Sequence, residues 1–165
     1  MKLLNSSMIA CAVFASLTAC SGNGMTPTDQ LNTTCATSPA MVTTAQLQAE
    51  VLTQKCTATC HEPGGTASAY GDYTTVDKAH EMVNKDSYLE GSGMTLKIVD
   101  AAAPVADRLA NSSIWLKCSA KVNNGFKGPK MEFTSTRMPP PGKDVLADAD
   151  VQKIKDWICT GANKM

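Results

Sequence analysis

Two cysteines and a histidine stand close together in the segment Cys56-Thr57-Ala58-Thr59-Cys60-His61. The related pattern Cys-x-x-Cys-His is typical of covalent haem attachment, and this chain has one extra residue between the cysteines. Residues three or four positions apart lie on the same face of a helix, so either spacing presents two thiols to one porphyrin edge. We therefore expect Cys56 and Cys60 to form thioethers with a haem. The next residue, His61, is then placed to bind the iron from the proximal side.

Three other interpretations of this cluster stay open. A disulfide between Cys56 and Cys60 suits a protein exported into an oxidising compartment. A zinc site is weaker, because Cys60 and His61 are adjacent and chelate awkwardly, and neither a second Cys-x-x-Cys nor a pair of histidines completes four ligands. His61 could also be an ordinary surface histidine after a helix. Covalent haem is the interpretation that the pattern favours.

An electron-transfer haem needs a sixth ligand to its iron, and a methionine thioether is a common choice. Met138 is the strongest candidate, in the segment Thr136-Arg137-Met138-Pro139-Pro140-Pro141-Gly142. The prolines fix the backbone after Met138 and stop a helix, which suits a loop that holds a side chain in place. Met131 is the substitute, Met82 and Met94 are weaker, and a methionine that simply fills a gap in the core is the competing interpretation.

These features together resemble a class I c-type cytochrome domain, of the kind found in exported bacterial lipoproteins. The resemblance covers nearly all of the predicted folded unit, although each matching stretch is short. It implies one covalent haem c, with His61 proximal and Met138 distal, and one-electron transfer in place of an enzymatic reaction. A haem peroxidase would require an open sixth position. The matching stretches are 51–56, 82–84, 113–117, 137–140 and 154–158, with Trp157-Ile158-x-x-Gly161-Ala162 at the end of the last helix.

The elements that must position these residues are mostly helical. Thr43 and Gln46 fit a capping box, which predicts a helix that runs toward Cys56. A second helix is expected from Thr74 or Thr75 to Asn84, and a third from Ser112 or Ser113. The last helix is expected from Ala147 or Asp148 to Cys159, with Gly161 as its stop. The pattern shows no long alternating strand, so we expect a small, mostly α-helical, cytochrome-c-like domain with long loops.

The N-terminal residues predict export and lipid anchoring. Residues 1–19 combine a positive Lys2 with an apolar stretch, and they end in Leu17-Thr18-Ala19, directly before Cys20. This pattern predicts a secretory signal, and Leu-Thr-Ala-Cys resembles the lipobox of bacterial lipoproteins, whose cysteine, here Cys20, is acylated. The alternative is an ordinary signal peptide that is cut near Ala19. Residues 20–41 form a predicted flexible tether, and residues 42–165 the folded domain. The resemblance to Gram-negative lipoproteins implies that Ser21 after the cysteine favours the outer membrane, facing the periplasm, over the inner membrane.

The remaining cysteines predict a disulfide that staples the domain. Cys118 and Cys159 lie near the ends of two predicted core helices, and their pairing would close a long loop. Cys35 is left in the tether and could instead pair with either of them, or with another chain.

Composition and charge limit the classes of partner. The 165 residues carry 15 Lys and Arg against 15 Asp and Glu, which gives no support for a nucleic-acid partner. A local excess of positive charge surrounds the Met138 segment; it either steers an acidic redox protein of the envelope or is a solvated loop surface. The predicted function is a lipid-anchored monohaem electron carrier. The alternative is a non-haem envelope lipoprotein of the same fold, used in binding or structure. The basic residues around the Met138 segment are Lys117, Lys121, Lys127, Lys130, Arg137 and Lys143.

Overall fold

The computed structural model describes residues 34–58, 60–88, 95–119, 127–128, 131–132, 137–140 and 142–165. The predicted signal peptide, the lipidation site Cys20 and most of the predicted tether lie outside these ranges, as do Met94, Lys121 and Lys130. None of the helices in the described ranges has the length and hydropathy that a membrane crossing requires.

The first helix begins at the capping box that the sequence predicts. The Thr43 side chain accepts a hydrogen bond from the Gln46 amide, and the Gln46 side chain accepts one from the Thr43 amide. The helix α1 (Thr44–Leu47) continues directly as the wider π-helix η2 (Gln48–Thr57). Leu47, Val51 and Leu52 are completely buried along it, so its apolar face packs on the core and delivers Cys56 to the interior.

The second helix is shorter than the sequence predicts. Thr75 caps α2 (Val76–His80), which ends four residues before Asn84. Asn84 adopts a positive φ of 60°, and its amide donates to the Val99 carbonyl at 2.7 Å. Val83 therefore leaves the helix and forms a β-bridge with Val99. Backbone pairing with a distant segment, which the local pattern does not reveal, ends this helix early.

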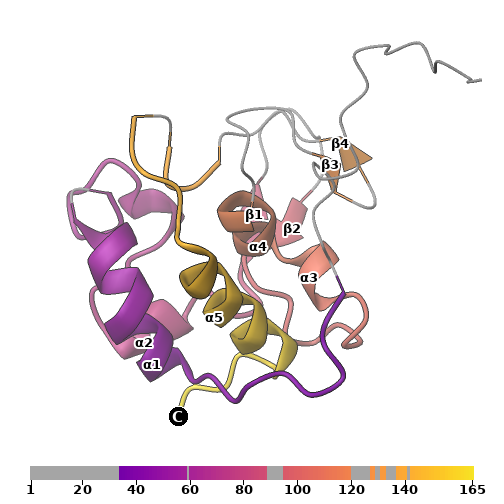
Figure 1. The fold of residues 1–165 in the computed structure, drawn as a ribbon. Helices are drawn as coiled ribbons and strands as arrows, with labels where there is room; N and C mark the ends of the chain where they lie inside the picture. Colours follow the sequence, from indigo (N-terminus) through magenta and orange to yellow (C-terminus); the bar gives the residue numbers. More distant parts are fainter. Residues whose placement is uncertain are drawn as a thin grey trace, which may run out of the picture.

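The last helix, α5 (Asp148–Cys159), lies at the centre of the fold and contacts α1, α3 and α4 (Figure 1). The short helix α3 (Arg108–Asn111), which the sequence did not predict, leads into α4 (Ser113–Ser119), which it did. Ile154, Trp157 and Ile158 of α5 are completely buried. Gly161, with a φ of 94°, follows the helix as the expected stop.

Two short antiparallel hairpins occur in segments predicted as loops. The strands β1 (Asp86–Tyr88) and β2 (Thr95–Lys97) pair with Ser87 opposite Leu96. The strands β3 (Lys127–Gly128) and β4 (Met131–Glu132) form the second hairpin, and a single turn of 3₁₀ helix, η3, covers Ser68–Tyr70. The described part of the chain is thus partly helical, with a small amount of strand, whereas the sequence predicts a mostly helical domain.

The prediction of a disulfide between Cys118 and Cys159 was wrong. Cys159 pairs with Cys35, while Cys118 is a buried thiol. The reason is where α5 ends. The Cys159 carbonyl accepts a hydrogen bond from Arg108, so Cys159 lies beside the residues that precede α4. Cys118 lies at the other end of α4, in its last turn. The last residues of the predicted tether are consequently attached to the end of α5.

Candidate functional site

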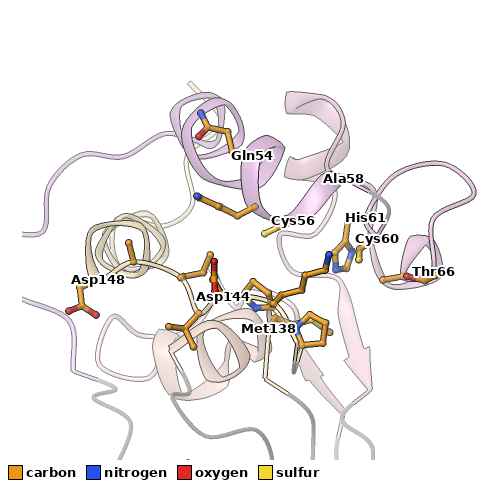
Figure 2. Close-up of a pocket in the computed structure, with 17 residues that line it drawn as sticks. Gln54, Cys56, Ala58, Cys60, His61, Thr66, Met138, Asp144 and Asp148 are labelled. Atoms are coloured by element: carbon orange, nitrogen blue, oxygen red, sulfur yellow. The ribbon is translucent and has the colours of Figure 1, made fainter.

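One pocket gathers the residues that the sequence singled out for haem binding. It has a volume of about 770 Å³, and Cys56, Cys60, His61 and Met138 all line it. The two cysteines and the histidine come from the end of η2 and the turn after it, and Met138 comes from the loop that leads to α5 (Figure 2). Segments far apart in the sequence therefore supply the two sides of one cavity. The pocket's apolar lining residues are Ala58, Ala67, Pro139, Pro140, Val145, Leu146 and Ala147.

Cys56 and Cys60 do not share one helix, which corrects the expected reason for their proximity. Ala58 already has a non-helical ψ of 115°, so η2 ends at Thr57 and Cys60 lies in the turn beyond it. The Cys60 amide donates to the Thr57 carbonyl, and the His61 amide to the Cys56 carbonyl, each at 3.2 Å. Cys56 therefore reaches the pocket from η2 and Cys60 from the turn after it, so the two thiols do not share one helical face.

His61 is held in the form that a metal ligand requires. Its Nδ1 lies 3.0 Å from the Gly71 carbonyl oxygen, which can only accept, so Nδ1 carries the proton and Nε2 keeps its lone pair. The side chain is only 8% exposed. Burial lowers the pKa of His61, partly opposed by the Gly71 hydrogen bond, and the Lys117 charge lowers it further. The imidazole is therefore neutral at pH 7, which is the state that binds metals.

Met138 sits on a loop whose backbone is fixed. Its amide donates to the Lys117 carbonyl at the end of α4 at 3.0 Å, and its side chain packs partly against the core. The Lys143 amide closes the following turn by donating to the Pro140 carbonyl at 3.1 Å. Residues 137–140 and 142–143 thus lie in a loop that hydrogen bonds hold on both sides of Met138.

The cysteines of the pocket are present as thiols, so the alternative Cys56–Cys60 disulfide is not formed. Burial raises the pKa of Cys56 to about 12, with smaller contributions from Cys60 and the Asp150 carboxylate. Burial also raises the pKa of Cys118. The thiolate is the reactive form of cysteine, and burial disfavours that form at Cys56.

The other candidate ligands lie elsewhere or are not described. Met82 is buried in the hydrophobic core. The second histidine of the chain, His80 in the last turn of α2, lies 3.1 Å from the Thr44 hydroxyl and hydrogen-bonds it. Met131 belongs to β4, and its side chain is outside the description. Within the described ranges, no cluster of three or more His, Cys, Asp or Glu side chains could hold a metal ion.

The residues of the pocket fit a covalent haem. The cavity size is within the usual range for cofactors, about 300–1,000 Å³. A haem iron needs only two axial protein ligands, and the neutral His61 and the Met138 thioether supply a suitable pair. The Cys56 and Cys60 thiols line the same space and are available to form thioethers.

Sequence reasoning missed the residues that orient His61 and the role of Arg137. Gly71 and Tyr73 stand in a segment with no recognisable motif, so no local signal indicated them. Arg137 was grouped with the surface lysines, yet its side chain is only 7% exposed and it bonds the loop around Met138. Its position directly before Met-Pro-Pro was the available signal.

Comparison with known proteins adds no assignment: no protein-family model, curated protein or solved structure matches this chain.

Proposed function

We propose that this protein is a lipid-anchored monohaem c-type cytochrome that carries single electrons in the cell envelope. The observation that carries the proposal is the pocket, where Cys56, Cys60 and His61 meet Met138. Cys56, Cys60 and His61 belong to one short motif, whereas Met138 comes from a distant segment, and the two segments face the same cavity. Each of the four side chains has the chemistry that its proposed role requires.

The roles of the residues follow from their positions. Cys56 and Cys60 would hold the haem through thioether bonds, while His61 Nε2 and the Met138 sulfur would be its axial ligands. When bound, the haem supplies a metal centre that gains and loses one electron without making bonds to a substrate. The Gly71 carbonyl holds the His61 ring in its tautomer, and this hydrogen bond also makes the imidazole a better donor. As iron ligands, the Met138 thioether and His61 would favour the reduced state, and so would raise the potential.

The envelope location is part of the same proposal. It is supported by the export signal and Cys20, and by the Cys35–Cys159 disulfide, which is typical of proteins outside the cytoplasm. Two acyl chains at Cys20 would hold the protein at the membrane. The partner would be another redox protein of the envelope, of acidic character if the basic segment steers it. We favour the periplasmic face of the outer membrane.

The test is haem staining of a denaturing gel, using full-length protein exported in a host that matures c-type cytochromes. Colour should stay with the denatured wild-type band and disappear in the Cys56→Ser/Cys60→Ser double variant. Cys118→Ser, which removes a buried thiol outside the motif, is the matched control and should keep its colour. A colourless wild type beside a coloured control cytochrome from the same host would overturn the proposal.

The axial ligand is tested on the same preparation. The oxidised spectrum should show a low-spin haem with methionine ligation, and Met138→Ala should lose that signature. Met41→Ala removes an exposed methionine and is the control. A high-spin wild-type spectrum would argue against a closed electron carrier. A redox titration of the wild type should follow a one-electron curve.

A further inference from the structure

Arg137 is a charged side chain buried beside Met138. Its Nη1 donates to the Pro139 carbonyl, and its Nη2 donates to the Lys143 carbonyl at 3.0 Å. One guanidinium therefore joins the residue immediately after Met138 to the far end of the same loop. Both bonds are charge-assisted, and such hydrogen bonds are roughly twice as strong as neutral ones.

The geometry shows why this connection matters for the thioether. The Met138 amide donates to the Lys117 carbonyl at the end of α4, which holds the backbone on the N-terminal side of Met138. Arg137 holds the backbone on the C-terminal side, because its guanidinium donates to the Pro139 carbonyl. Because Met138, Pro139, Pro140 and Lys143 all line the pocket, the segment that Arg137 ties together is the wall of the pocket.

We propose that Arg137 is a positioning residue: it keeps the Met138 loop closed over the pocket and so resists displacement of the thioether by competing ligands. The part of this inference that concerns displacement of the Met138 thioether rests on the proposed haem function. Lysine cannot replace arginine here, because an ammonium is a point charge and does not span two carbonyl groups with the planar fork of a guanidinium.

The chain offers a matched control in Arg108. Its guanidinium also donates to two backbone carbonyls, those of Ala103 at 3.1 Å and Cys159 at 2.8 Å. Arg108 binds the C-terminal end of α5. The pocket lies at the other end of this helix, where the N-cap Ala147 and the first residue Asp148 line it. Arg108→Lys thus reproduces the loss of carbonyl contacts without touching the Met138 loop.

The first measurement is imidazole binding to the oxidised, haem-loaded protein, followed by its spectrum. Imidazole must displace Met138, so its apparent affinity reports how firmly the loop is closed. We expect Arg137→Lys to bind imidazole roughly tenfold more tightly than wild type, as the loss of a charge-assisted bond implies. Arg108→Lys should bind it within twofold of wild type. Equal affinities for wild type and Arg137→Lys would overturn the inference.

The second measurement uses the full chain without haem, and so separates this inference from the proposed function. Amide hydrogen exchange at Met138, measured by NMR, should be roughly tenfold faster in Arg137→Lys, because opening of the loop releases the bond to Lys117. Arg108→Lys should leave it unchanged. If wild type takes up no haem, the proposed function fails, and this exchange rate alone decides whether Arg137 holds the loop. An unchanged rate refutes that role. Arg137→Gln, which keeps a planar amide donor, replaces Arg137→Lys if the latter does not fold.

Discussion

The imidazole of His61 stacks on the phenol ring of Tyr73, with ring centroids 4.4 Å apart and 19° between the planes. The same two residues are joined through the backbone, since the Tyr73 amide donates to the His61 carbonyl at 3.0 Å. The Gly71 carbonyl also binds Nδ1 of the ring. Tyr73 thus holds one face of the imidazole and the backbone of His61, and Gly71 holds one edge of the ring. The protein chain alone therefore orients the proposed proximal ligand, before any cofactor is present.

We expect Gly71→Ala to damage this arrangement severely. Gly71 has a φ of 155°, and an added Cβ would lie 2.7 Å from the Tyr73 ring. The substitution should lower the free energy of unfolding by about 2–4 kcal/mol, from backbone strain plus overpacking. Gly64→Ala is the control: its φ is also positive, at 80°, but nothing lies within 4 Å of the added Cβ. It should cost only about 1 kcal/mol. Urea denaturation of both variants measures the difference, and equal losses would contradict the role of Tyr73.

The haem-free chain should lose stability in mild acid because of His61. Burial lowers the pKa of this residue in the folded state, while the unfolded chain keeps a value near 6.5. The unfolded state then binds more protons, so the free energy of unfolding falls as pH drops below about 6.5. His61→Asn should flatten this part of the profile, whereas His80→Gln should retain the His61 contribution. Chemical denaturation between pH 5 and 8 is the measurement (about the range in which histidine titrates), and an unchanged slope in His61→Asn would refute the assignment.

The disulfide should connect Cys35 to Cys159, and it should contribute strongly to stability. The two cysteines are 124 residues apart in sequence, so the crosslink constrains most of the unfolded chain. Cys35→Ser should lower the free energy of unfolding by roughly 2–5 kcal/mol. Peptide mapping by mass spectrometry under non-reducing conditions identifies the pairing directly. A linked peptide containing Cys118 and Cys159 would contradict the pairing of Cys35 with Cys159.

Thr44→Val should destabilise the junction between the first and last helices. The buried Thr44 hydroxyl donates to the Asn163 carbonyl at 3.0 Å and accepts from the Trp157 indole N–H at 3.1 Å. Valine has a similar shape but leaves these buried polar groups without their partner, which costs about 1–3 kcal/mol. Thr44→Ser keeps the hydroxyl and should lose clearly less. Thermal or urea unfolding compares the two, and equal losses would mean that the methyl group and not the hydroxyl matters.

Helix positions were largely predictable because their signals are local. The Thr43–Gln46 capping box and the apolar spacing of α5 require only neighbouring residues, and both elements form where they were expected. The second helix was predicted too long because Val83 pairs with Val99, an interaction between distant segments. The hairpins escaped prediction for a different reason: their strands have only two or three residues, too few to show an alternating apolar pattern.

Residue type and spacing are enough to single out Cys56, Cys60, His61 and Met138 as chemically suited to the site. Three features follow from packing instead: the Met138 loop lies against the same cavity, Gly71 and Tyr73 orient His61, and Cys159 pairs with Cys35. The difference lies in the sequence distance over which each feature is encoded. A cap or a motif is encoded within a few residues, whereas a pocket wall, a stacked ring or a disulfide depends on where packing of the core brings distant segments together.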